Sequence, residues 1–154
     1  MEQRSAIPKV VGILMIVFAC LGLAWTGIVM FQEELFKEVA GMDKAVSRTA
    51  LIFDLVAIAI GLLQLVAGIK AIGYKDRAPR LAVTYALAKL ASVIAWVAVT
   101  YLYLIPHLGS SRVASQSLVD GSGIAISAGF YAIWPILVLA LMTRPSVRES
   151  CTNF

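Results

Sequence analysis

Charged residues are scarce in this chain: Asp, Glu, Lys and Arg make up 14% of its 154 residues, whereas 60% are hydrophobic. Soluble domains typically carry about 25% charged and about 45–50% apolar residues. A chain this poor in charge cannot cover a soluble surface. The composition therefore excludes a soluble globular domain and predicts a membrane protein.

Residues that carry common catalytic and metal chemistry are also scarce. The two cysteines, Cys20 and Cys151, form no CxxC pair, and the single histidine, His107, has no Cys, Asp or Glu cluster beside it. There is no glycine-rich phosphate loop and no nucleophile with an evident base. The sequence therefore argues against an enzyme and predicts no catalytic residue, no metal and no cofactor.

What the chain has is long apolar runs. Four of them are near the roughly 20 residues that a helix needs to cross a bilayer, whereas barrel strands would be about half that length. We expect helices over residues 9–31, 50–71, 80–105 and 122–143. The predicted fold is all-α: one domain, 1–154, forming a polytopic, antiparallel bundle of four transmembrane helices.

Basic residues are distributed unequally beside these runs. The end that would hold both termini carries Arg4, Lys9, Lys70, Lys75, Arg77, Arg80, Arg144 and Arg148. The other end carries Lys37, Lys44, Arg48 and Arg112. This bias predicts a multi-pass protein of the cell membrane with both termini in the cytoplasm. It also accounts for the net charge of +4, so no nucleic-acid partner is expected.

Small and polar residues recur at helical spacing along the second run. This stripe contains Ala50, Asp54, Ala57, Gly61, Gln64, Gly68 and Ala71. Small residues let helices approach closely in a membrane, so the stripe should face protein rather than lipid. Similar stripes run through Gly12 and Gly22 in the first helix and through Gly129, Ala132 and Ile136 in the fourth. The shared seven-residue repeat favours a left-handed bundle.

The third run carries a bulkier and more polar stripe that includes Tyr85, Lys89, Ser92 and Trp96. The short turn before it predicts an antiparallel hairpin with the second helix. In the register that this turn suggests, Gly68 faces Tyr85, Gln64 faces Lys89, and Gly61 faces Ser92. Asp54 would lie within a turn of Thr100.

Asp54, Gln64, Lys89, Ser92 and Thr100 form the candidate intramembrane polar site. A charged residue at the centre of a membrane helix costs at least about 2.5–3.5 kcal/mol, so such residues suggest function. The structural alternatives are that Lys89 reaches toward the membrane surface, that Asp54 is hydrated, and that Gln64 joins two helices.

Two further features bear on helix shape. Segment 31–48 has hydrophobic residues at helical spacing, which predicts either a short amphipathic helix at the membrane surface or an extension of the first helix. Pro135 lies within the fourth helix and is expected to kink it.

These features favour a noncatalytic membrane protein that packs against, assists or regulates another protein. Its expected partners are membrane lipids and a second copy of itself or a larger membrane complex. The first alternative is a small oligomeric transporter or channel using Asp54, Gln64 and Lys89. The second is a lipid-modifying membrane enzyme with Tyr85, Arg77 and Arg80 near its site, although fold analogy alone does not establish such chemistry.

Overall fold

The computed structural model describes residues 6–40, 44–104 and 121–152, and the described chain is all-helical. The long helices are α1 (Ile7–Ala40), α2 (Lys44–Ile72), α3 (Ala78–Val99) and α6 (Gly121–Met142). A π-helical segment, η1 (Thr100–Leu104), continues α3, and the short helix α7 (Pro145–Thr152) follows α6. The predicted all-α class is confirmed.

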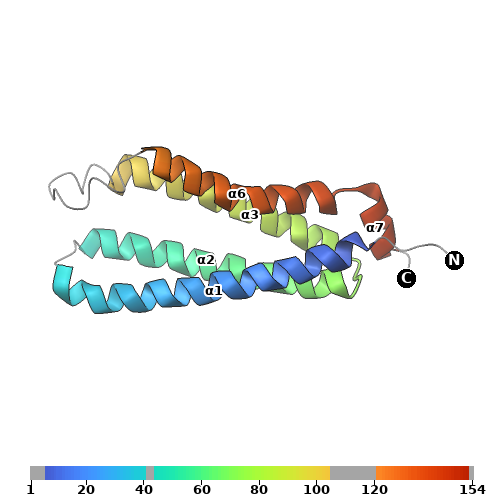
Figure 1. Ribbon diagram of the computed structural model, residues 1–154, viewed down its shortest axis with the longest axis horizontal. Helices are drawn as coiled ribbons and strands as arrows, with labels where there is room; N and C mark the ends of the chain where they lie inside the picture. The colour runs from blue at the N-terminus through green and yellow to red at the C-terminus, as the bar shows by residue number, and fades with distance from the viewer. Residues whose placement is uncertain (1–5, 41–43, 105–120, 153–154) are drawn as a thin grey trace.

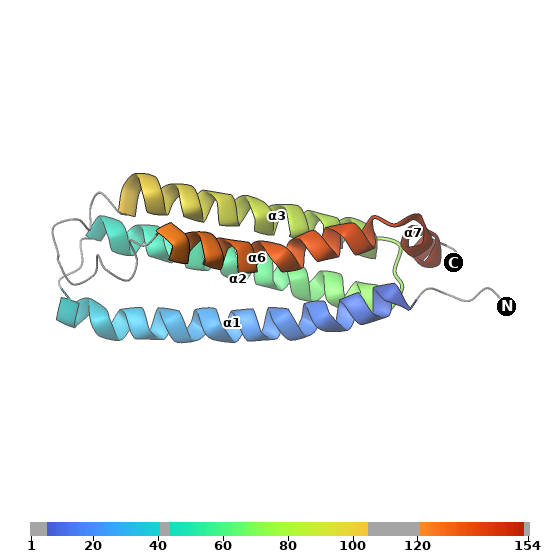
Figure 2. The same cartoon turned by 45° about the horizontal axis from the view of Figure 1, so that its top comes forward.

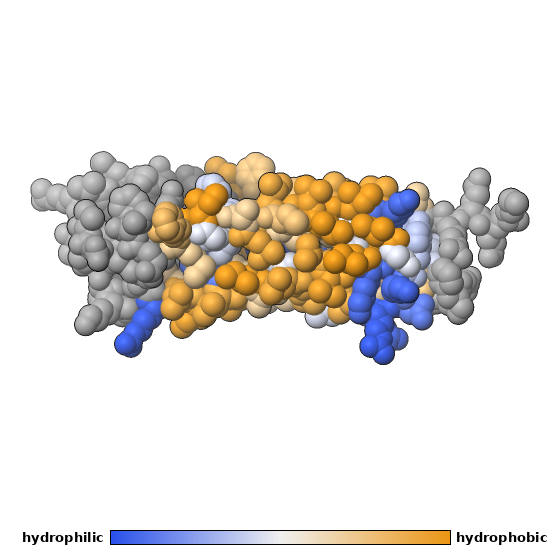
Figure 3. All heavy atoms as spheres, turned by 90° about the horizontal axis from the view of Figure 1, so that it is seen from below, coloured by the Kyte–Doolittle hydropathy of each residue, from blue (hydrophilic) through white to orange (hydrophobic). Residues whose placement is uncertain are grey.

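Three helices are long and apolar enough to cross a membrane, over Ile7–Phe31, Arg48–Ile72 and Ala78–Leu102. A fourth span exists if the pair Ala128–Met142 and Pro145–Cys151, bent by 71° between them, is counted as one. On the face shown in Figure 3, hydrophobic side chains form a broad band, with hydrophilic side chains gathered toward the end where the chain termini lie. The chain is thus a helical membrane protein.

The long helices are arranged as two pairs. α1 packs along α2, α3 packs along α6, and the pairs are joined mainly through α2 and α3. Figures 1 and 2 show both termini, α7 and the α2–α3 turn at one end, which we call the terminal end. In Figure 1 the two pairs lie close together there and diverge toward the opposite end.

The buried core follows this arrangement, because it is concentrated near the terminal end. Its larger members include Met15 from α1, Tyr85 from α3, and Val138 and Met142 from α6. Val147 of α7 belongs to the same cluster. α7 packs against α3 and α6, so it covers the terminal end of the bundle.

The turn between α2 and α3 has a defined geometry. The amide of Lys75 donates to the carbonyl of Lys70 and the amide of Tyr74 donates to Ala71, which is the paired bonding of a Schellman motif. Tyr74 occupies the left-handed position, with φ of 50°. Pro79 then lies at the start of α3, where a missing N–H is tolerated. The predicted antiparallel hairpin of these two helices is present.

Two sequence predictions need comment here. The described backbone of α1 runs without a break to Ala40, so the extension of the first helix, and not a separate interfacial helix, is what forms there. At about 1.5 Å per residue, this 34-residue helix is about 51 Å long and exceeds the hydrocarbon thickness. The four-span count and the left-handed twist remain predictions.

Candidate functional site

The closest helix contact in the terminal half joins α1 and α2 through two glycines. A Cβ atom at Gly12 would lie 2.7 Å from the carbonyl oxygen of Gly68, and a Cβ at Gly68 would lie 2.8 Å from that of Gly12. No L side chain fits at such a distance from a backbone atom. The glycines therefore set the spacing of the two helices.

This contact corrects the predicted register of the small-residue stripe on α2. Gly68 packs on Gly12, Met15 and Ile16, and a Cβ at Gly61 would meet the side chain of Leu23, 2.9 Å away. The nearest neighbours of both glycines thus come from α1 rather than from Tyr85 and Ser92 of α3. The physical reason is that two glycine-bearing helices can approach more closely than a glycine helix and a bulky one.

Gln64 strengthens the same interface. Its side chain is 6% exposed, and its Nε2 donates to the backbone carbonyl of Met15 at 3.0 Å. The expected pairing with Lys89 is therefore wrong, because the stripe that carries Gln64 faces α1. Gln64 joins two helices, as the structural alternative proposed.

Lys89 instead connects α3 with α6. Its Nζ lies 5.5 Å from the centre of the Tyr131 ring, within the range of a cation–π interaction. Ser92, one turn further along α3, donates its hydroxyl to the carbonyl of Lys89 at 2.8 Å. This bond within one helix leaves the Ser92 hydroxyl committed to its own backbone.

Asp54 and Thr100 differ from these three residues. Asp54 is half-buried, Thr100 is 8% exposed, and the buried Oδ2 of Asp54 and Oγ1 of Thr100 have no hydrogen-bond partner among the described residues. Thr100 also begins η1, and π-helical segments occur frequently at functional sites. Counted from the α2–α3 turn, Asp54 lies about 27 Å and Thr100 about 33 Å along their helices, well toward the opposite end.

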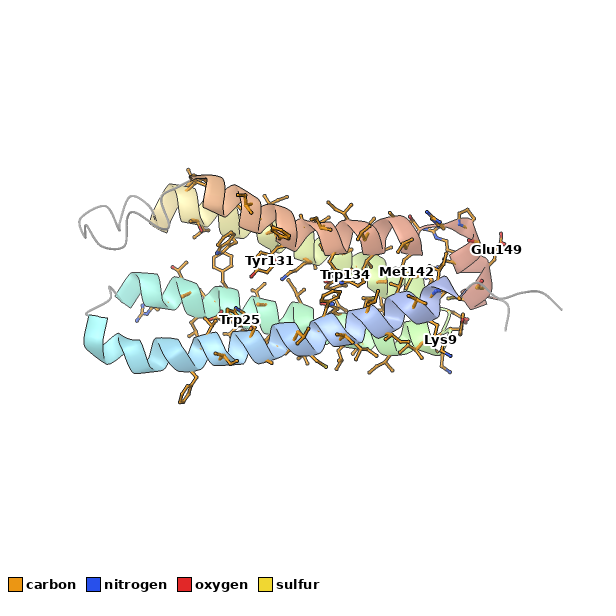
Figure 4. All side chains as sticks on the ribbon, viewed as in Figure 1. Lys9, Trp25, Tyr131, Trp134, Met142 and Glu149 are labelled. Carbon is orange, nitrogen blue, oxygen red and sulfur yellow. The ribbon has the colours of Figure 1, made fainter. Side chains whose placement is uncertain are left out.

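An aromatic pair joins α1 to α6 near the middle of the bundle. The rings of Phe18 and Trp134 lie 4.9 Å apart and are tilted by 50°, and Figure 4 shows Trp134 and Tyr131 on the same helix. The indole nitrogen of Trp134 is buried, and the side chain of Trp134 interacts with that of Tyr85 on α3. Sequence reasoning missed Tyr131 and Trp134, because neither interrupts an apolar pattern.

Beyond this pair, the predicted packing stripes are exposed. A Cβ at Gly22 or Gly129 would have nothing within 4 Å, so these glycines make no close contact with other described residues. Ala57 is half-buried. The stripe assigned to the fourth helix is wrong in part, since Ile136 is 53% exposed whereas the adjacent Pro135 is buried. Because α6 is continuous through Pro135, a kink there remains a prediction.

The described residues contain no group of three or more His, Cys, Asp or Glu side chains that could hold a metal ion. Tyr85, a candidate for lipid chemistry, is only 1% exposed. Its phenol lies inside the core, where a lipid headgroup cannot reach it. Searches against protein-family models, curated proteins and solved structures found no match.

Proposed function

We propose that this chain is a noncatalytic accessory subunit that binds another transmembrane helix between its two helix pairs, in the half opposite the terminal end. The partner helix belongs either to a second copy of the chain or to another membrane protein. This assignment follows from the packing of the two halves rather than from any catalytic group.

The proposal rests on the position along each helix at which side chains stop being buried. Within the described residues, buried side chains extend from the terminal end as far as Ala19 in α1, Ile60 in α2 and Pro135 in α6. The first two positions lie about 18 Å along their helices from that end, which is little more than half of a bilayer core. Further from the terminal end, the small-residue stripe of α1 continues at Gly22. A Cβ there would have no described atom within 4 Å.

The polar atoms of this half indicate the chemistry of the partner. One carboxylate oxygen of Asp54 and the hydroxyl of Thr100 are buried without a hydrogen-bond partner among the described residues, and such atoms are costly in a membrane. Because the Asp54 side chain as a whole is only half-buried, a helix that approaches Gly22 closely can donate a hydrogen bond to the accessible part of this side chain. Small residues and a hydroxyl, amide or basic side chain are therefore expected on the partner.

The test is the mass of the complex extracted in mild detergent at native abundance. Gly22→Leu should reduce the associated mass to that of a single chain, because Leu fills the space intended for the partner. Ala24→Leu is the matched control: it makes a similar change two residues along α1, on an exposed surface of the opposite face. If Gly22→Leu retains the same mass as the parent, this face contacts lipid and the proposal is wrong.

Transport is the second candidate, and it is favoured by the buried oxygens of Asp54 and Thr100, which have no hydrogen-bond partner in the described part of the chain. Lys89→Met should fold at least as well as the parent, because it keeps most of the volume and removes a charge that is costly to bury. If the polar set carries ions, Lys89→Met and Asp54→Asn should be stable but should fail to rescue a deletion strain. Full rescue by both variants would remove the case for transport.

We also propose that the terminal end faces the cytoplasm of a cell membrane. The support is the excess of Lys and Arg beside that end, eight against four in the sequence. Lys9 and Glu149 lie there in Figure 4. A reporter that is active only outside the cytoplasm should be inactive when fused to either terminus. Activity at both termini would reverse the orientation.

A further inference from the structure

A surface pocket lies at the α2–α3 turn, at the terminal end and away from the proposed partner surface. Its volume is about 480 Å³. The lining residues are Ile69, Lys70, Gly73, Lys75, Asp76 and Arg77. Three of these side chains are cationic and one is anionic, so the lining carries a net charge of about +2 (3 − 1).

The backbone of the turn brings these charges together. The Schellman motif stops α2 and reverses the chain at Gly73 and Tyr74. Lys75 comes directly after this reversal. The Cε atom of Lys75 lies 3.8 Å from where a Cβ on Gly73 would be, so the lysine stem folds back over the glycine. Gly73 itself lines the pocket, so the absence of a side chain there leaves room in it.

The surroundings also favour an anion. The pocket lies between the ends of two apolar spans, Arg48–Ile72 and Ala78–Leu102, where lipid headgroups are found. The first turn of α3 contains no acidic residue and its N-cap, Arg77, makes no side-chain cap, so Asp76 is the one lining carboxylate beside the positive end of the helix dipole. Basic pockets between membrane helices are suited to phosphate-bearing headgroups.

We propose that this pocket binds a phosphate-bearing anion through Lys70, Lys75 and Arg77. A general excess of positive charge at this end would attract anions without a defined site. The pocket differs from that general attraction in two respects: three cationic residues line one hollow, and the stem of one of them, Lys75, lies against Gly73, where an added side chain would narrow that hollow.

The experiment measures the melting temperature of the full chain in neutral detergent as three probes are added separately: phosphatidylglycerol, phosphatidylcholine and inorganic phosphate. Stabilisation by phosphatidylglycerol alone identifies an anionic lipid headgroup. Stabilisation by inorganic phosphate as well identifies a soluble phosphate compound as a ligand. No stabilisation by either anion overturns the proposal.

Two variants test the pocket itself. Gly73→Leu leaves the charge unchanged, and its Cβ would lie 3.8 Å from the nearest described atoms, so it should fold normally but lose the stabilisation by the anion. The triple variant Lys70→Gln, Lys75→Gln, Arg77→Gln should weaken anion binding by more than about tenfold, since each basic residue contributes roughly fivefold.

Two further variants provide the contrast. The triple variant Lys9→Gln, Arg80→Gln, Arg144→Gln removes the same charge from the same end without changing the lining, and should weaken binding less than the first triple variant does, because these cations lie outside the pocket. Asp76→Asn should strengthen binding, because it removes the one carboxylate in the pocket lining. If the two triple variants weaken binding equally, or if Gly73→Leu binds as the parent does, general surface charge explains the effect and the proposal is wrong.

Discussion

The two halves of this molecule carry the same sequence pattern but differ in packing. In the terminal half, Gly12 and Gly68 bring α1 and α2 into backbone contact, and a core cluster joins both helix pairs. In the opposite half, Gly22 continues the same stripe on α1 with nothing beside it. A small-residue stripe therefore makes close approach possible, but only a partner helix at the right distance makes it a contact.

Gly68→Leu should have the largest effect, because it breaks the terminal half. The new Cβ would lie 2.8 Å from a backbone oxygen, which cannot rotate away as a side chain can. We expect a loss of about 3 kcal/mol in unfolding free energy, measured by denaturant titration in detergent. A stable Gly68→Leu variant would show that α1 and α2 can separate without loss.

The Phe18–Trp134 pair should have the next largest effect, because it joins the two helix pairs at the limit of the core. A double-mutant cycle with Phe18→Leu and Trp134→Leu should give a coupling free energy of about 0.5–1.5 kcal/mol. Additive effects of the two substitutions would place the boundary between the halves elsewhere.

Gln64→Leu should cost less than the changes above. It removes one hydrogen bond to the carbonyl of Met15, and interhelical hydrogen bonds in membranes contribute on average about 0.6 kcal/mol. The carbonyl of Met15 lies inside α1 and keeps its helical partner. A loss above about 2 kcal/mol by the same titration would mean that Gln64 holds more than this single contact.

Gly22→Leu should have the smallest effect on the single chain. Because a Cβ there meets nothing within 4 Å, the unfolding free energy should stay within about 0.5 kcal/mol of the parent. Compared with Gly68→Leu, this variant measures the difference between the halves directly. A large loss would show that the opposite half is closed within one chain.

Much of the fold could be predicted from the sequence. Long apolar runs determine which segments are helical, and the short turn around Asp76 makes α2 and α3 an antiparallel hairpin. Periodicity also identified the face of α2 that turns away from lipid, since Gln64, Gly68 and Ala71 are buried.

The neighbours of that face could not be predicted in the same way. Periodicity shows which residues share a side of a helix but not which helix lies opposite. It therefore cannot predict that Gln64 bonds to Met15 rather than to Lys89. The cation–π contact of Lys89 with Tyr131 depends on the placement of α6, which follows a segment outside the described residues. The point along each helix at which side chains stop being buried also depends on how the helices pack. The small-residue stripe continues past that point.

The position of α7 has a consequence for the order in which this chain folds. Val147 and Cys151 of α7 are completely buried, and Val147 belongs to the same core cluster as Val11 of α1. α7 leaves the ribosome after every element that it packs against. The earlier helices can insert and pair one after another, but their shared core is completed only when this helix arrives. The assembly of the terminal half is therefore a late, post-insertion event in biosynthesis.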